Sequence, residues 1–383
     1  MPPLSASLRL TLAGFAALAL AMGIGRFAYT PLLPLMLQDR LLSLADGGLI
    51  ASVHFLGYLT GALVAAKLPL SPQNMMRLSL FGIGVTTLGM GLVENVIIWS
   101  VLRWIAGVCS AWILVLVSNF VIRTLANTGH TGGSGAVFSG VGGGILLIGL
   151  VCLLFMTAGA GSAAGWIWVG AGSLVTALLL CLTFGAELPS ERPVRRRADG
   201  EQRAFIWPMI ISYGTAGFGY SIPATYLPVM ASDIISDPLI FGWSWPLFGL
   251  AAFLSTFFAG RLRRRFSGLH IWTISQFIMG AGVLIPVVWP TITGIALSGL
   301  MVGGTFMIIT MAGMQEAHRV APAGDVMRHI AALVSAFATG QMLGPVLASS
   351  IHTVTGNFDA VLVLTTASLL ATTVTLMTAR SLR

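Results

Sequence analysis

Residues 23–36 read GIGRFAYTPLLPLM, which places Arg26 inside an apolar run that extends from about residue 10 to residue 37. Such a run is long enough to cross a lipid bilayer, which takes about 20 apolar residues. A guanidinium at the centre of a span costs roughly 2.5–3.5 kcal/mol even on lenient insertion scales, and such residues nearly always face a cavity or a partner. The stretch therefore predicts a membrane helix with a polar feature at its centre.

The same stretch has a second copy in the other half of the chain. Residues 217–230 read GFGYSIPATYLPVM and match residues 23–36 at five of fourteen positions, at an offset of 194. Under this alignment Tyr220 corresponds to Arg26. A duplication of this kind predicts two similar bundles related by an axis along the membrane normal, with a substrate site where the bundles meet.

The composition of the whole chain agrees with a membrane protein. Hydrophobic residues make up 56% and charged residues only 8% of the 383 residues, and the mean hydropathy is +0.92. Soluble domains usually carry about 25% charged residues, so the chain is predicted to be an all-α integral membrane protein with about twelve spans. The expected spans are residues 10–37, 47–66, 76–93, 97–122, 135–157, 165–185, 206–230, 240–262, 269–288, 291–315, 329–352 and 360–379.

The longest polar segment divides these spans into two sets of six. It covers residues 186–204 and is predicted to be a cytoplasmic linker between an N-terminal six-helix bundle, 1–185, and a C-terminal six-helix bundle, 205–383.

Positive charge predicts the orientation. If the N-terminus is cytoplasmic, 17 of the 20 Lys and Arg residues lie on the cytoplasmic side, so we expect a multi-pass protein of the cell inner membrane with both termini inside. This topology also accounts for the net charge of +8, so membrane lipids rather than nucleic acid are the expected partners.

Two arginines, Arg26 and Arg103, fall well inside predicted spans, whereas every Asp and Glu falls at the edge of a span or in a loop. Two membrane cations without a membrane carboxylate indicate that a mobile anion completes the site. The alternative is structural: Arg103 braces two helices through backbone carbonyls, and Arg26 binds carbonyls left without donors by Pro31 and Pro34.

Other candidates follow from helical spacing and from the repeat. Tyr29 and Thr30 share the face of Arg26, and Tyr220 is expected to look back across the cavity. Aromatic residues in helices more often serve packing, and that alternative stays open. The substrate-binding candidates are Arg26, Tyr29, Thr30, Arg103, Tyr220, Tyr226 and Gln341.

His54 is the only histidine well inside a predicted span, and its unperturbed pKa suits a proton carrier. Hydrogen-bonded packing is the alternative. Uniport, exchange against a counter-anion, and co-transport with protons all remain open at this stage.

Glycines recur at matched places in the two halves. Gly140 and Gly144 correspond to Gly340 and Gly344 at an offset of 200, and Pro345 follows the second pair. Small residues four apart let helices approach closely and slide, which predicts a gating role; ordinary tight packing is the alternative.

These motifs resemble the major facilitator superfamily. Residues 103–107, RWIAG, resemble its arginine motif in helix 4, and residues 140–144 occupy the position of its helix 5 glycine motif. The usual loop motif after helix 2 is altered, because an alanine stands where an Asp is expected ahead of Lys67. The stretches similar to the poorly characterised YbfB/YjiJ branch are 23–36, 217–230, GGTFM at 303–307 and GQMLGP at 340–345. The resemblance implies a monomeric secondary transporter that works by alternating access.

Together these observations predict transport of a small organic, anionic solute. A proton-coupled efflux pump for drugs or other amphipathic compounds is the alternative, although such pumps normally use a buried acid. A non-transporting sensor on the same fold is a further alternative. No catalytic motif such as HExxH is present, and the three cysteines lie in apolar stretches, so we expect no enzyme activity, metal or cofactor.

Overall fold

The computed structural model describes residues 6–65, 68–121, 133–184, 207–263, 265–320 and 326–381. These residues form twelve helical rods of membrane length, which confirms the predicted all-α membrane fold. The elements are α1 (Ala6–Leu18), η1 (Ala19–Ile24), α2 (Tyr29–Gln38), α3 (Leu44–Val64), α4 (Pro72–Met90), α5 (Val96–Leu116), η2 (Val117–Val121), α7 (Gly133–Thr157), α8 (Ser162–Phe184), α9 (Trp207–Ile234), α10 (Pro238–Phe241), α11 (Ser244–Arg263), α12 (Gly268–Val288), α13 (Ile292–Val320), α14 (Val326–Thr355) and α15 (Asp359–Ser381).

Ten rods in the described part of the chain are both long and apolar enough to cross a membrane by themselves. The other two, α4 and α9, have 19 and 28 residues and are of sufficient length. The predicted span limits lie within a few residues of the observed ones because the bilayer thickness sets helix length.

The first rod is not the continuous helix that the run 10–37 predicts. It consists of α1, the π-helix η1, a turn over residues 25–28, and α2. The amides of Gly25 and Phe27 donate to the carbonyls five residues earlier, at 2.8 and 3.2 Å. The restart at Tyr29 places Pro31 in the first turn of α2, where its missing N–H costs no helical hydrogen bond.

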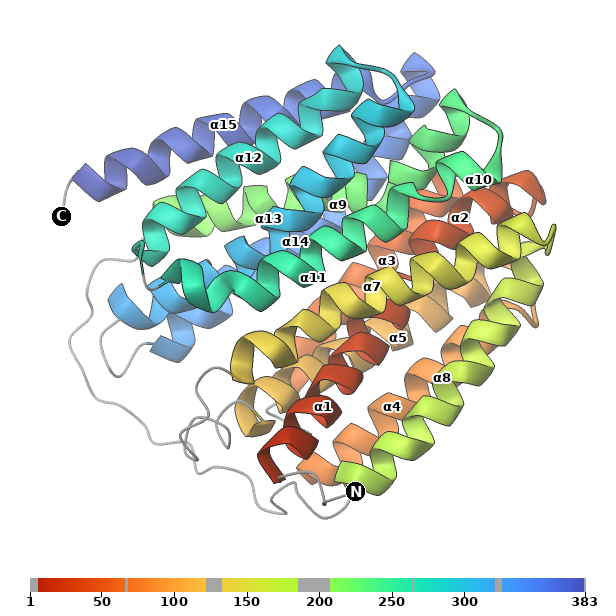
Figure 1. Cartoon of the computed structure of the whole chain (residues 1–383), viewed down its shortest axis with the longest axis horizontal. Coiled ribbons are helices and arrows are strands. Elements are labelled where there is room, and N and C mark those ends of the chain that lie inside the picture. The colour runs from red at the N-terminus through yellow and green to blue at the C-terminus, as the bar shows by residue number, and fades with distance from the viewer. Residues whose placement is uncertain are drawn as a thin grey trace.

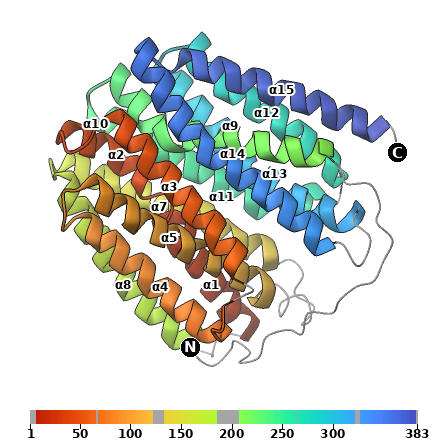
Figure 2. The same ribbon diagram turned by 180° about the vertical axis from the view of Figure 1, so that it is seen from behind.

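The rods form two bundles, α1 to α8 and α9 to α15, which lie side by side in both views (Figures 1 and 2). Between the bundles, α7 packs on α11, α3 on α14 and α2 on α9. The ribbons come together at the end that carries α10 and spread toward the end where the chain termini lie. We call these the α10 end and the terminal end. The predicted linker, 186–204, and residues 66–67 of the altered loop motif lie outside the described residues.

Close contact between the bundles depends on glycines. A Cβ atom on Gly142 of α7 would collide with the backbone of Phe253 in α11, and one on Gly48 of α3 would come within 2.8 Å of the Pro345 carbonyl in α14. Gly149 packs against Pro246 at the α10 end. The bundles therefore touch backbone to backbone at these positions.

In the N-terminal bundle, the predicted gating glycines Gly140 and Gly144 face the first rod. A Cβ on either would collide with the backbone of Phe15 or Ala19.

The matched pair in the C-terminal bundle makes the equivalent contact with α9. A Cβ on Gly340 would collide with the backbone of Gly214, and one on Gly344 with the side chain of Ser221. The repeat therefore preserves tight packing inside each bundle, which is the alternative raised from the sequence. A role for these four glycines in movement stays a prediction.

Candidate functional site

Arg26 lies in the turn that interrupts the first rod, where η1 has ended and α2 has not begun. Its side chain is 7% exposed, and its guanidinium carbon lies 4.9–5.5 Å from the ring centres of Phe27, Phe55, Tyr58 and Tyr220. The Nε and Nη2 atoms are buried and find no hydrogen-bond partner among the described residues. The predicted meeting of Arg26 with its repeat counterpart Tyr220 is thus present in the structure.

A narrow cavity lies beside Arg26, between the two bundles. It contains about 310 Å³ of space free of protein atoms, its mouth included, but the walls stand so close that only about one water molecule fits between them. An organic ligand therefore needs the walls to move apart. The lining residues are Arg26, Phe27, Tyr29, Thr30, Ala51, His54, Phe55, Arg103, Ala224 and Thr225.

Arg103 of α5 is the second cation of this cavity, and it is completely buried. Its Nη1 donates to the Gly25 carbonyl at 3.1 Å, and its guanidinium lies 5.3 Å from the Trp166 ring centre. The structural alternative, in which Arg103 braces two helices through a backbone carbonyl, therefore accounts for its Nη1 atom. Nε and Nη2 remain buried with no partner in the described parts of the chain. In both arginines, the unpartnered atoms are the pair that binds two oxygens of a carboxylate in parallel.

His54 of α3 joins this cavity next to Arg103. Gly57 and Gly107 lie where α3 meets α5, and a Cβ on either would collide with the backbone of the other helix. This close approach brings the His54 Nδ1 within 3.0 Å of the Arg103 carbonyl oxygen. The His54 Nε2 is buried and has no hydrogen-bond partner among the residues described.

Thr30 connects the two bundles directly. Its hydroxyl donates to the Ala224 carbonyl of α9 at 2.5 Å. That carbonyl has no donor four residues later in its own helix, because residue 228 is a proline. Thr30 and Ala224 are also counterparts at the repeat offset of 194, so this bond joins equivalent positions of the two bundles. Tyr29 instead donates to the Gly47 carbonyl at 3.1 Å and holds α2 against α3.

The C-terminal bundle places an aromatic cluster beside Arg26, although its own residues in the cavity lining are Ala224 and Thr225. The Tyr220 ring stacks between Phe306 and Phe337, with ring centres 5.0 and 5.6 Å away. Gln341 of α14 donates through its Nε2 to the Tyr220 hydroxyl at 2.5 Å. Gln341 therefore supports Tyr220 and does not line the cavity itself.

Tyr226 lies away from the cavity lining. Its hydroxyl donates to the Pro345 carbonyl at 3.0 Å, and its ring centre is 5.1 Å from that of Phe358. The first contact holds α9 against α14, and the second packs α9 on the residue before α15, as expected for a packing residue.

Sequence reasoning missed three aromatic residues around Arg26: Phe27, Phe55 and Tyr58. Tyr58 follows His54 by four residues and shares its helix face, so that spacing was an available signal. No local pattern distinguishes Phe27 or Phe55 from ordinary membrane residues.

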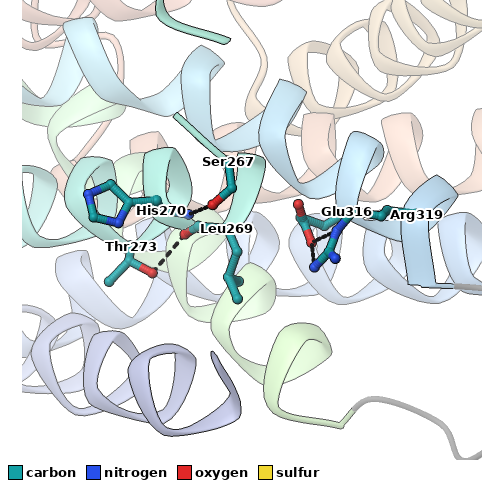
Figure 3. Close-up of polar contacts among 6 residues, drawn as sticks. All are labelled: Ser267, Leu269, His270, Thr273, Glu316 and Arg319. Carbon is teal, nitrogen blue, oxygen red and sulfur yellow. Dashed lines mark hydrogen bonds and ion pairs between the residues drawn. The ribbon is translucent and has the colours of Figure 1, made fainter. Parts of the chain in front are cut away.

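A buried carboxylate exists at the terminal end, away from the cavity lining. Glu316 of α13 is 2% exposed, and its Oε2 accepts from Arg319 Nε at 2.9 Å and Nη2 at 2.7 Å (Figure 3). A Cβ on Gly268, the first residue of α12, would lie 2.6 Å from the other carboxylate oxygen. The described residues that line the cavity include no Asp or Glu.

Comparison with known proteins assigns the chain to a family. The family described as "Uncharacterised MFS-type transporter YbfB" matches residues 18–377. The chain belongs to this family of the major facilitator superfamily. As an MFS protein it is a multi-pass membrane transporter rather than an enzyme.

Curated relatives of this MFS transporter have no assigned substrate in their names. Uncharacterised MFS-type transporters of Yersinia pestis and Yersinia pseudotuberculosis are 25% identical over 340 residues, which covers 83% of this chain and 82% of each relative.

Solved structures share the MFS fold at low identity. The nucleoside transporter NupG, as a D323A mutant, has a TM-score of 0.72 at 13% identity and covers 97% of this chain and 99% of its own. A bacterial homologue of the human lysosomal transporter Spinster, inward-facing and unoccupied, has a TM-score of 0.68 at 15% identity, with 98% and 96% covered. At these identities the likeness concerns the fold alone.

Proposed function

We propose that this MFS secondary transporter moves a small organic anion across the cell membrane by alternating access. One observation carries the proposal: Arg26 and Arg103 line the same cavity, and each keeps a buried Nε and Nη2 without a partner in the described residues.

Buried donors of this kind are costly unless a ligand satisfies them. A buried charge that lacks both a counter-charge and hydrogen bonds is strongly unfavourable, whereas a carboxylate, sulfonate or phosphate oxygen pair matches the Nε–Nη2 edge. The same two charges repel a cationic solute. An anion is therefore the ligand class that offsets the cost, and a cationic drug adds to it.

The aromatic rings around Arg26 suggest the shape of the ligand. Phe27 and Phe55 lie against Arg26 from the N-terminal bundle, and Tyr220 from the C-terminal bundle, so the charged group is flanked by apolar ring faces. A small anion with a flat apolar body fits these walls once the cavity widens. Thr30 and Tyr29 contribute hydroxyls that could reorient toward such a ligand after the bundles separate.

The bundles 1–185 and 205–383, joined by residues 186–204, are the proposed moving bodies. With both termini cytoplasmic, as positive charge predicts, the α10 end faces outward, and the contacts of Gly48, Gly149 and Thr30 hold the bundles together near that end. Opening to the outside then requires the contacts of Gly48, Gly149 and Thr30 to separate.

A ligand panel tests the proposal. Purified protein is heated with benzoate, benzenesulfonate, succinate or inorganic phosphate, and with benzamide and tetraphenylphosphonium as neutral and cationic comparisons. A ligand that binds only the folded protein at about 100 times its Kd adds about 2.7 kcal/mol of stability, which raises the melting temperature.

The variants are Arg26→Ala and Arg26→Lys, with Arg77→Ala as the control because Arg77 is an exposed arginine of α4. Because a hydrogen bond to a charged group contributes about 1.5–3 kcal/mol, Arg26→Ala should weaken anion binding by about 10- to 100-fold. Arg26→Lys should lose the two parallel hydrogen bonds to the anion but keep the positive charge, and so retain part of the anion affinity. Stabilisation by tetraphenylphosphonium alone, or equal anion affinity in Arg26→Ala, would refute the proposal and favour the drug-efflux alternative.

A further inference from the structure

His54 is held in a defined orientation by the meeting of α3 and α5. Its Nδ1 faces the carbonyl oxygen of Arg103, and an oxygen without hydrogen can only accept. The hydrogen of a neutral His54 ring therefore resides on Nδ1. It follows that Nε2 carries a lone pair and is the atom open to an additional proton.

That lone pair is buried in a cavity in which all charged groups among the described lining residues are positive. Arg103 of α5 and Arg26 of the turn 25–28 face the cavity together with His54, and α2 contributes the neutral Tyr29. On α3 itself, Tyr58 lies one helical turn from His54. The lining residues from α9 are Ala224 and Thr225, and α14, which packs on α3, contributes no described residue to the lining.

Two guanidinium groups oppose a third positive charge on His54 as long as the cavity holds no anion. An anion held by the arginines reverses this effect, because its charge cancels theirs and its oxygens accept from a protonated Nε2. Proton binding and anion binding then favour each other, and by linkage each raises the affinity for the other.

We propose that His54 is the proton carrier of this transporter and that its Nε2 takes up one proton together with the anionic substrate. This inference rests on the proposed function. In the occupied cavity, the protonated His54 donates one hydrogen bond through Nδ1 to the Arg103 carbonyl oxygen and another through Nε2 to the anion. When the anion leaves, the arginines expel the proton to the same side, so anion and proton travel together.

The experiment uses benzenesulfonate, whose charge does not change between pH 6 and 8.5, or another panel anion of constant charge that shows an Arg26-dependent shift. Its Kd is measured across this pH range. Addition of the anion to weakly buffered protein is followed with a pH indicator dye. The affinity should rise as the pH falls, by up to about tenfold per pH unit, which is the limit for one coupled proton. The solution should become more alkaline, with at most one proton taken up per site.

His54→Asn is the main variant, because its amide retains a donor for the Arg103 carbonyl and does not titrate. The control is His270→Asn at the start of α12, at the terminal end (Figure 3). The His270 ring stacks on Phe266, with ring centres 5.6 Å apart. In His54→Asn the anion affinity should be independent of pH and proton uptake should vanish. In His270→Asn both should match the unmodified protein.

Each result has a distinct meaning. If the unmodified protein binds an anion with flat affinity and no proton uptake, or if uptake persists in His54→Asn, the carrier role is overturned while the proposed anion site stands. If His54→Asn fails to fold, flat affinity without proton uptake in the unmodified protein still overturns the carrier role. If no anion in the panel binds, the proposed function fails and the coupling fails with it.

Discussion

Replacement of Thr30 by valine should shift the protein toward the conformation that is open at the α10 end. The Thr30 hydroxyl donates to the Ala224 carbonyl across the two bundles, and Pro228 leaves that carbonyl without a donor in its own helix. Valine has nearly the same shape as threonine but no hydroxyl. In the variant the buried carbonyl of Ala224 remains unpaired as long as the bundles stay together at this end.

The size of the shift follows from the strength of one such bond. Hydrogen bonds between membrane helices contribute about 0.6 kcal/mol on average and about 1.7 kcal/mol at most. A difference of 1.4 kcal/mol is about tenfold in an equilibrium constant, so Thr30→Val should favour the open conformation by about three- to eighteen-fold. Thr30→Ser keeps the hydroxyl and should leave the equilibrium close to that of the unmodified protein.

Spin labels at the α10 end can measure this equilibrium. Leu92 follows α4 and is 65% exposed, and Trp289 follows α12 and is 48% exposed, so one label on each reports the separation of the bundles. The labels are introduced as cysteines in protein that lacks its three native cysteines. The reasoning is refuted if Thr30→Val leaves the distance distribution unchanged or favours shorter distances, or if Thr30→Ser behaves like Thr30→Val.

Two further predictions concern the α7–α11 contact and the Tyr220 ring beside Arg26, each with its own comparison. In a thermal unfolding assay, Gly142→Ala should lower the melting temperature by an amount equivalent to about 1–3 kcal/mol, because the added Cβ collides with α11. A Cβ on Gly172 meets nothing within 4 Å, so Gly172→Ala should be neutral or slightly stabilising in the same assay. Equal effects of the two alanines would contradict this account of the α7–α11 contact. Tyr220→Phe should retain Arg26-dependent anion binding in the ligand panel, because the ring still stacks on Phe306. Tyr220→Leu removes the ring and should weaken anion binding. Equal anion binding by both variants would argue against a ring contact with Arg26.

The membrane fold followed from local properties of the chain. Apolar runs of about 20 residues, polar breaks and an internal repeat predicted twelve helices with nearly correct limits. This succeeded because a bilayer leaves the backbone few alternatives to helices of fixed length. The repeat also predicted that Tyr220 would face Arg26, since residues at equivalent positions of two facing bundles approach the axis that relates them.

The first helix shows where that approach failed. Prolines and glycines were visible in the run 10–37, yet a continuous span was predicted. In the structure Ser110 donates to the Ala21 carbonyl at 2.8 Å and Arg103 to the Gly25 carbonyl, so donors from α5 stabilise the interrupted backbone. Those donors lie 89 and 78 residues further along the chain, beyond the reach of any local pattern.

By itself, the sequence determined that this is a membrane protein, where its helices lie, that its two halves repeat, and that two arginines without acidic partners lie within the membrane. All of these features depend on composition and on the spacing of residues along the chain. Only the tertiary structure decided that one nitrogen of Arg103 donates to a backbone carbonyl, that Thr30 bridges the bundles and that His54 shares a cavity with both arginines. Such contacts depend on how helices from distant parts of the chain pack, and side chains of equal polarity in the sequence acquire different partners through that packing.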